Sequence, residues 1–461
     1  MPANPPENRS RFWRDDFPFR PRNLFGGRIF YGWVIAFGAT IGILFSIPGQ
    51  TMGFSVFTEG LMESLGLTRV QLSAAYCVGT VASGLTLPAL GRLYDFWGGR
   101  KMAVVAALST GFILFYLALI SRIYKALPSG PVIAFLLIGL GFYLIRMSAQ
   151  GVLTMSSRNL VGKWFDVRRG FALAVSGILV SFGFSAAPKF LDLLIGKFGP
   201  SGAWFVLGAT TILVMAPLAY LVFRDAPEDC GMEMDGGKIV SRHAKNPDME
   251  MHRDFTRAEA LRTFSLWVFA LSFAFFSLYS TAFTFHIVSL GAEFGFEKSR
   301  ILNLFVPMAV VSVLTSLFCG WINSRTRLKW LLAAMNGGAL LGAIGLLRLS
   351  EPGGVWLYVI GNGVCGGFFS ALSGIVWPRF YGRKWLGSIS GVNMSAMVIA
   401  SGLGPLLFAF AVQATGSYGP ALAGSIAIPA LLMLASFGAD NPQLKRDKKT
   451  GPGSFPPDPA G

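Results

Sequence analysis

Arg146 stands near the middle of a long apolar stretch, GPVIAFLLIGLGFYLIRMSAQGVL, at residues 130–153. Holding a cation within membrane hydrocarbon costs about 2.5–3.5 kcal/mol on insertion scales, and such residues usually mark a substrate or ion path. A guanidinium can hold a carboxylate through two parallel hydrogen bonds. Gln150, four residues later on the same helix face, can add a third contact. The pair therefore predicts an anion-binding site.

Two other roles stay open for Arg146: a structural contact with backbone carbonyls or a neighbouring helix, and a place in a proton path. Four further polar residues inside apolar stretches are candidate substrate contacts: Gln50, Tyr279, Asn362 and Asn393. Gln50 follows Pro48-Gly49, a break that could expose backbone to a cavity. Each of the four also suits hydrogen bonding between helices.

Lys189 and Asp192 lie three residues apart near the end of another apolar stretch. They could form a local ion pair, or a gate that traps or admits an anion. No carboxylate lies in the middle of a stretch, and a buried carboxylate is a common proton relay in membrane transport. Protons could still be carried by the substrate's own carboxylate or by His286. His286 is better explained as a packing histidine with satisfied ring nitrogens.

The elements that must position these residues are membrane-spanning helices. The chain has 461 residues, of which 53% are hydrophobic and 13% charged, whereas soluble domains carry about 25% charge. A span needs about 20 apolar residues. The sequence predicts an all-α polytopic membrane protein with twelve spans, at 29–57, 71–91, 102–121, 132–157, 170–195, 203–223, 264–290, 301–322, 330–349, 354–378, 386–413 and 420–438.

Basic residues predict the orientation of these spans. Of the 39 Lys and Arg residues, 30 fall in the tails and one set of connecting segments, and seven fall in the other set. Cytoplasmic segments are the ones enriched in Lys and Arg. We therefore expect both termini in the cytoplasm of a plasma (inner) membrane protein. The net charge of +16 is explained by these segments and predicts contact with the lipid bilayer, not with nucleic acid.

The polar segment 224–263 separates six spans from six. We expect a cytoplasmic N-tail at 1–28, helix bundles at 29–223 and 264–438, and a cytoplasmic C-tail at 439–461. The halves repeat weakly: GRLYDFWGGRK follows the second span and GWINSRTRLKW the eighth, while KWFDVRRGFAL precedes the fifth and RFYGRKWLGSI the eleventh. Parallel repeats of six spans are one way in which transporters are built, with the site between the halves.

Cofactor and enzyme chemistry find no support in the sequence. The four cysteines and three histidines have no metal-ligand spacing, and no nucleophile–base pair stands out. We expect no metal, no cofactor and no enzymatic activity.

The loop at residues 91–101 resembles the signature between the second and third helices of the major facilitator superfamily, roughly G-x-x-x-D-[RK]-x-G-R-[RK]. Phe96 stands where that pattern has a basic residue, and one residue is added near Gly99. The resemblance implies a latch at the inner helix ends, in which a carboxylate among arginines and helix ends makes a breakable contact. We expect the latch to include Gly91, Arg92, Asp95, Gly98, Arg100 and Lys101. In the second copy Ser324 replaces the aspartate, which predicts a weaker latch.

Other segments are similar to the monocarboxylate and oxalate/formate-type branch of that superfamily: YGWV at 31–34, GQTMGFSVF at 49–57, WFDVRRGFAL at 164–173, DAPEDCGMEMDG at 225–236 and FTRAEALRTFSLW at 255–267. The branch moves small organic anions. Its members place essential cations in helix 8 and in helix 1 or 11, whereas those spans are uncharged here. The family's anion-binding residues therefore cannot be carried over, and Arg146 is the remaining candidate.

We expect a secondary transporter for a small organic anion, such as a mono- or dicarboxylate, working by proton symport or anion exchange as a monomer. A drug/proton antiporter is the alternative. R-M-S-A-Q-G resembles the antiporters' helix-4 motif R-x-x-Q-G but is one residue longer, which would rotate Gln150 by about 100° relative to Arg146. Their helix-5 signature G-P-x-x-G-G is absent. A transporter-like membrane sensor is a weaker alternative.

Overall fold

The computed structural model describes residues 30–128, 130–237, 246–249, 251–351 and 353–445. Across these ranges the chain is helical and no strand occurs. The predicted N-tail, and residues 446–461 of the predicted C-tail, lie outside the described residues.

The described residues contain twelve crossings, as the sequence predicts. Ten helices are long and apolar enough to cross a membrane. One of them, Arg169–Val222, bends at Gly199 (φ 71°) just before Pro200 and so supplies two crossings. The remaining crossing is the interrupted first one, which begins with the shorter apolar helix Gly32–Phe45.

The helices of the N-terminal half run from Gly32 to Val222. They are α2 (Gly32–Phe45), η2 (Ile47–Gly49), α3 (Thr51–Phe54), η3 (Ser55–Phe57), α4 (Thr58–Leu65), α5 (Arg69–Trp97), α6 (Gly99–Ala126), α7 (Pro131–Ile145), η4 (Arg146–Leu153), α8 (Thr154–Trp164), α9 (Arg169–Thr210), η5 (Thr211–Met215) and α10 (Ala216–Val222). The fourth crossing, α7–η4–α8, is therefore longer than the predicted span 132–157.

The C-terminal half begins after the central loop. Its helices are α11 (Arg257–Leu261), α12 (Phe264–Glu293), α13 (Lys298–Asn303), α14 (Phe305–Ile322), α15 (Leu328–Leu347), α16 (Gly354–Tyr381), α17 (Leu386–Thr415) and α18 (Gly419–Ser436). Short 3-10 turns occur in the central loop, at Glu228–Cys230 (η6), Met234–Gly236 (η7) and Pro247–Met249 (η8), and after α18 at Pro442–Lys445 (η9).

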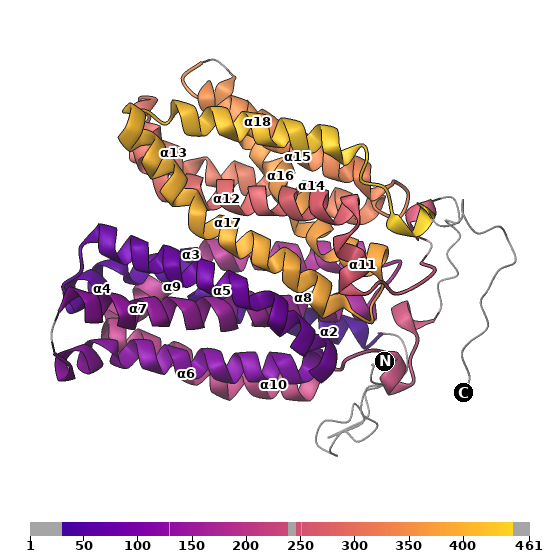
Figure 1. Cartoon of the computed structure of the whole chain (residues 1–461), viewed down its shortest axis with the longest axis horizontal. Helices are drawn as coiled ribbons and strands as arrows, with labels where there is room; N and C mark the ends of the chain where they lie inside the picture. Colours follow the sequence, from indigo (N-terminus) through magenta and orange to yellow (C-terminus); the bar gives the residue numbers. More distant parts are fainter. Residues whose placement is uncertain (1–29, 129, 238–245, 250, 352, 446–461) are drawn as a thin grey trace, which may run out of the picture.

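The two halves lie side by side with their long helices roughly parallel (Figure 1), α2 to α10 in the lower group and α12 to α18 in the upper one. The seam between them is formed by α5 with α17, by α9 with α14, and by α8 with α16 and α17. One end of the bundle carries the segments 91–101, 163–169, 323–329 and 379–387, together with the described residues of the central loop at 224–237, 246–249 and 251–263. We call this end the central-loop face.

Four aspartates of the central loop bind backbone N–H groups at the starts of helices. Asp225 accepts from Arg100 at the start of α6 (2.9 Å), and Asp235 accepts from Val167 just before α9 (2.8 Å). In the C-terminal half Asp248 accepts from Leu328 at the start of α15 (2.7 Å). Asp254 accepts from the N–H of Arg383 just before α17 (2.7 Å). A carboxylate at a helix start meets unpaired N–H groups and the positive end of the helix dipole.

These contacts follow the internal repeat. The helix starts at α6 and α15 occupy equivalent places in the two halves, as do those at α9 and α17. The loop therefore binds each half at the same two positions, and its segments 225–237 and 246–254 belong structurally to different halves.

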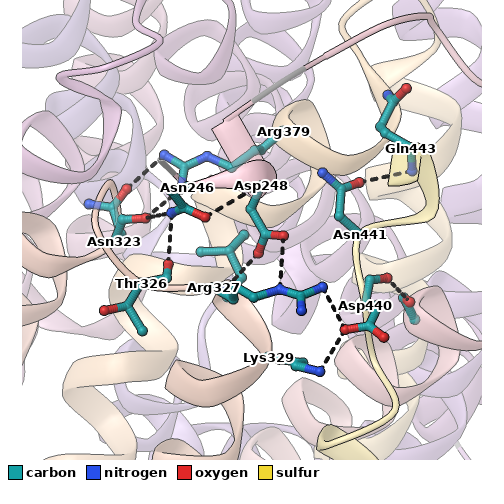
Figure 2. A network of polar contacts seen from close by, with 12 residues as sticks. Asn246, Asp248, Asn323, Thr326, Arg327, Lys329, Arg379, Asp440, Asn441 and Gln443 are labelled. Carbon is teal, nitrogen blue, oxygen red and sulfur yellow. Dashed lines mark hydrogen bonds and ion pairs between the residues drawn. The ribbon is translucent and has the colours of Figure 1, made fainter. Parts of the chain in front are cut away.

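Figure 2 shows the network on the C-terminal half. Asp248 lies between the start of α15 and Arg327, whose guanidinium also binds Asp440 at 2.8 Å. Lys329 binds the same carboxylate at 2.7 Å. Asn246 donates to the carbonyl of Thr326 (3.1 Å). The loop and the segment after α18 are thus fixed to one side of the seam.

A pH test addresses this network. Burial raises the pKa of Asp248, although the Leu328 N–H and Arg327 oppose the shift. The folded protein therefore holds a proton on Asp248 more tightly than the unfolded chain does. Because of this difference, protonation of Asp248 increases the free energy of unfolding as the pH falls through the folded-state pKa. We expect Asp248→Asn to remove part of the stability gain between pH 7 and pH 4. Thermal unfolding of both proteins across this range measures it, and equal gains would contradict the prediction.

Candidate functional site

The first crossing breaks where it meets the fourth. Pro48 cannot donate a hydrogen bond to the preceding turn, because proline has no N–H. Gln50 has an extended backbone (φ −89°, ψ 154°). Gly49 lies against the fourth crossing, where a Cβ on it would come within 2.7 Å of the Ile145 carbonyl oxygen. A glycine is therefore needed for this approach, and it brings the free backbone of the break beside Arg146.

The fourth crossing changes its winding at this point. Residues Arg146–Leu153 form a π-helix between α7 and α8. In a π-helix the backbone bonds span five residues, and such turns frequently occur at functional sites. The wider turn takes up one extra residue, so the expected 100° rotation of Gln150 relative to Arg146 does not apply. That expectation was wrong because it assumed uniform α-helical winding.

Arg146 is buried, with 1% of its surface exposed. Its Nη1 donates to the Gly49 carbonyl (3.2 Å) and to the Thr51 hydroxyl (3.4 Å), and its Nη2 donates to Ser401 Oγ in α17 (2.8 Å). The ring of Tyr76 lies 5.1 Å from its Cζ. The guanidinium therefore touches both halves, through neutral groups.

No ion pair reaches Arg146 from the part of the chain that the structure describes, and its Nε has no hydrogen-bond partner. A buried N–H without a partner costs about 1–3 kcal/mol, and an unpaired buried charge costs more. The arrangement is thus suited to receiving an anion. Sequence reasoning found Arg146 but missed Tyr76, Thr51 and Ser401, because hydroxyl groups within spans are common and carry no distinctive spacing.

The two glutamines lie close to this centre without contacting Arg146. Gln50 donates to the Ser46 hydroxyl at 3.2 Å. Gln150 lies in the π-helix beside Gly49, and its Oε1 is buried without a partner. A carbonyl oxygen in that state can accept a hydrogen bond from a ligand's hydroxyl or protonated carboxyl group.

The other predicted contacts form separate groups. Tyr279 in α12 is 4% exposed and lies beside Asn362, whose Nδ2 donates to the Tyr358 carbonyl (3.0 Å). Asn393 in α17 donates to the sulfur of Met397, and its Oδ1 has no partner. The structure does not bring these three side chains to Arg146.

A half-buried arginine inside the bundle differs from its predicted place. Arg158, assigned to a cytoplasmic segment from the sequence, lies in α8 and donates to Ser373 Oγ of α16 across the seam (2.6 Å). The following residue, Asn159, donates to Ser390 of α17 (2.7 Å). Arg146 is therefore not the one arginine inside the bundle, because the fourth crossing continues to Trp164.

The segment predicted to form a latch makes contacts between the halves at the central-loop face. Asp95, at the end of α5, accepts the N–H groups of Gly387 (2.6 Å) and Ser388 (2.7 Å) and also the Ser388 hydroxyl. These belong to the first turn of α17. A carboxylate of one half thus caps a helix of the other half. Gly91 lies directly against Gly387, so that a Cβ there would overlap its carbonyl oxygen.

The remaining latch residues act within the N-terminal half. Gly98 has φ 85° beside the Asp225 carboxylate, where a side chain would be both strained and blocked. The Arg100 side chain donates to the Tyr220 carbonyl (2.9 Å). Lys101 lies 4.8 Å from the Trp97 ring centre, and Arg92 is exposed.

The second copy of the latch uses a neighbour of the predicted residue. Within the described residues the Ser324 hydroxyl makes no hydrogen bond, whereas Asn323 is fully buried against Gly170 in the first turn of α9. Gly320 meets the same glycine, as Gly91 meets Gly387 in the first copy. The repeated latch therefore has an uncharged amide in its second copy.

The glycine contact supplies a prediction. Gly91→Ala places a methyl group against the Gly387 carbonyl, and overpacking of this kind costs about 1–3 kcal/mol. We expect the central-loop face to open more often, seen as longer distances between spin labels at positions 96 and 325. Gly139→Ala is the matched control, because nothing lies within 4 Å of a Cβ there. Unchanged distances in Gly91→Ala would refute the close contact.

Three predicted residues at the opposite end of the bundle, Lys189, Asp192 and His286, lie in different environments. Lys189 and Asp192 are exposed and form no ion pair with any residue that the structure describes. His286 has both ring nitrogens engaged: Nε2 bonds the Pro405 carbonyl (3.0 Å) and Nδ1 bonds the Tyr418 hydroxyl (2.9 Å). The packing role expected for His286 agrees with these contacts. No cluster of His, Cys, Asp or Glu suited to a metal ion occurs among the described residues.

Comparison with known proteins identifies a family and solved structures that share this architecture. Residues 39–405 match the Major Facilitator Superfamily, and no curated protein sequence matches the chain. Among solved structures, the human organic anion transporter MFSD10 (TETRAN) is 16% identical with a TM-score of 0.60, covering 89% of this chain and 99% of that one.

Two further structures share the fold at similarly low identity. A bacterial homologue of the iron transporter ferroportin, in an outward-facing state, is 13% identical with a TM-score of 0.62, covering 88% of this chain and 99% of that one. The proton:xylose symporter XylE is 14% identical with a TM-score of 0.64, covering 90% and 98%. The family match extends over most of the twelve crossings and both halves, and the chain therefore belongs to the major facilitator superfamily of membrane transporters.

Proposed function

We propose that this transporter carries a small organic anion, a mono- or dicarboxylate, and that Arg146 binds its carboxylate while Gln150 orients it. One observation carries the proposal: Arg146 is 1% exposed and meets only neutral groups. An anion would supply the charge that the site lacks. An organic anion transporter has the same fold, so this fold is compatible with such a substrate.

The contacts of Arg146 suggest how binding and movement are coupled. Gly49 and Thr51 hold it from the N-terminal half, and Ser401 holds it from the C-terminal half. A carboxylate can replace these neutral acceptors with charge-assisted bonds, which are roughly twice as strong. Once the substrate's carboxylate pairs with Arg146, the site no longer contains an unpaired charge that would oppose movement of the surrounding helices. Access would alternate by rocking of the halves about this centre.

The proposal also gives the orientation of the protein in the membrane and the division of the chain into tails, helix bundles and central loop. The central-loop face would lie in the cytoplasm, with tails at 1–28 and 439–461 and bundles at 29–223 and 264–438 joined by the loop 224–263, in a plasma (inner) membrane. In this structure the latch is closed on that face. Lys189 and Asp192, exposed at the opposite end, would attract or admit the anion. Tyr279, Asn362, Asn393 and Gln50 would contact the substrate in other states of the cycle.

Coupling would use the substrate's own carboxylate. Arg146 has no carboxylate partner in the described part of the chain, and His286 is held by Pro405 and Tyr418. Proton symport by a protonated carboxylate, or exchange of one anion for another, needs no further titrating side chain. We propose one of these two modes, in a monomer of the monocarboxylate and oxalate/formate-type branch.

The drug/proton antiporter is the second candidate, and the π-helix is the observation that favours it. It absorbs the extra residue of R-M-S-A-Q-G, so that Arg146 and Gln150 approach the relation they have in R-x-x-Q-G. A membrane sensor has no comparable support.

A thermal-shift screen of the purified protein tests the class of ligand. Small carboxylates and lipophilic cations are compared, because a ligand that binds the folded state raises its unfolding temperature. Stabilisation by carboxylates alone supports the anion proposal, and stabilisation by cations alone contradicts it. Counterflow of a labelled hit in proteoliposomes then separates transport from sensing.

A further inference from the structure

A small cavity lies at the central-loop face, on the seam between the halves. Its volume is about 40 Å³. Arginines from both halves line it: Arg169 at the start of α9, Arg379 near the end of α16, and Arg383 just before α17. Among the described residues, Asp166 is the one carboxylate that lines it. The cavity is remote from Arg146, which lies in the middle of the fourth crossing.

Two of these arginines have donors without a partner among the described residues. Arg169 is 2% exposed; its Nε donates to the Phe165 carbonyl (2.8 Å) and its Nη2 lies 3.6 Å from Asp166, but its Nη1 has no partner. Arg379 is 3% exposed; both Nη atoms donate to Asn323 (2.9 and 2.7 Å), but its Nε has no partner. Each half thus presents a buried guanidinium with an unsatisfied N–H.

The charges also oppose each other across the seam. Arg169 and Arg379 repel one another, and Arg383 adds to the repulsion at Arg169. Asp166 is 41% exposed, so water screens its charge. Arg383 is already paired with Glu228 (2.8 Å). Like charges buried at a closing interface favour its opening unless something lies between them.

Nearby carboxylates do not fill this role. Asp235 and Asp248 lie within electrostatic range of Arg169 and Arg379 respectively. Both oxygens of Asp235 accept backbone N–H groups at residues 166–168. Asp248 binds the Leu328 N–H and lies 3.7 Å from Arg327. Asp235 is thus engaged at a helix start. Asp248 Oδ1 has no hydrogen-bond partner among the described residues, but neither carboxylate lines the cavity.

We propose that this cavity binds a small inorganic anion, of about the size of chloride or nitrate, which bridges Arg169 and Arg379 and stabilises the closed central-loop face. The volume exceeds the roughly 10–15 Å³ that one water requires, so a monatomic or small polyatomic anion can enter. The remaining lining includes the side chains of Met234, Met249 and Met251, which offer no competing charge.

The site exists only when the halves meet, because its arginines come from both. A ligand of the closed state alone shifts the equilibrium towards closure. At ten times its dissociation constant the anion would raise the ratio of closed to open protein about elevenfold. The effect does not depend on what Arg146 binds, so it can be measured without any transported substrate.

Thermal unfolding of the purified, delipidated full-length protein tests the proposal. Chloride, bromide and nitrate are compared with gluconate, which is too large for the cavity, at equal ionic strength. We expect a saturable rise of a few degrees in the three small anions. The same titration with phosphatidylglycerol separates a free anion from a lipid headgroup: stabilisation by the lipid alone would overturn the proposal.

Three variants locate the effect. Arg379→Gln should lose the anion dependence. Met251→Glu, at a residue 45% exposed on the cavity, adds an internal carboxylate and should be as stable in gluconate as wild type is in chloride. Arg325→Gln, an exposed arginine on the same face, should keep the wild-type dependence. An unchanged anion dependence in Met251→Glu would assign the effect to the general surface and overturn the site, even if Arg379→Gln does not fold.

Discussion

Arg146→Gln is expected to lose transport while keeping or gaining stability. The variant removes the cation that would bind the carboxylate, and hydrogen bonds to charged groups contribute about 1.5–3 kcal/mol each. Counterflow of a carboxylate substrate should fall by roughly 10- to 100-fold, since about 1.4 kcal/mol corresponds to tenfold. At the same time an unpaired buried charge and an unsatisfied Nε disappear. The free energy of unfolding should therefore stay equal or rise by up to about 3 kcal/mol.

This combination separates binding from a structural role. If Arg146 served mainly to join Gly49 to Ser401, its replacement would lower the unfolding temperature together with transport. Arg146→Lys is the matched variant, because it keeps the charge but not the two parallel donors. It should retain partial counterflow. A large loss of stability in Arg146→Gln would contradict the proposed role.

Asp95→Asn is expected to open the central-loop face. The carboxylate accepts two N–H groups in the first turn of α17, where the helix dipole adds to the attraction. An amide keeps one acceptor oxygen and loses the charge, and we expect a cost to the closed state of about 2–3 kcal/mol. The ratio of open to closed protein should rise roughly 30- to 160-fold.

Spin-label distances between positions 96 and 325 measure this change, in a background with the native Cys77, Cys230, Cys319 and Cys365 replaced by alanine. Phe96 is exposed near the end of α5, and Arg325 is exposed on the other half. A longer-distance population should appear in Asp95→Asn. Asp192→Asn, an exposed carboxyl at the opposite end, should leave the distances unchanged. The latch is refuted if Asp95→Asn behaves in the same way.

Much of the fold follows directly from the sequence. Hydropathy alone identifies twelve crossings, because each must bury about 20 apolar residues. The repeated loops predict two similar halves, and the aspartates at the starts of α6 and α15 make the repeat visible in space. Helix ends were less predictable: the fourth crossing passes through Arg158, since contacts with Ser373 and Ser390 stabilise polar residues that hydropathy assigns to a loop.

Two residues of the candidate site stand out in the sequence. Arg146 and Asp95 are unusual residues for their positions, and charge makes them conspicuous. The π-helix was not predictable, because it depends on how Gly49 packs against Ile145. Ser401 and Tyr76 were missed for the same reason: their roles arise from tertiary contacts between crossings far apart in the sequence. The anion cavity at Arg169 and Arg379 also requires the two halves to be assembled.

In the proposed function, Arg146 provides the positive charge that binds the substrate's carboxylate. Isothermal titration of wild type and Arg146→Gln with the carboxylate found by the thermal-shift screen measures this binding. We expect the dissociation constant to increase at least tenfold in the variant. Both proteins are first shown to be folded. Equal dissociation constants in the two proteins would show that the anion binds elsewhere and would contradict the account.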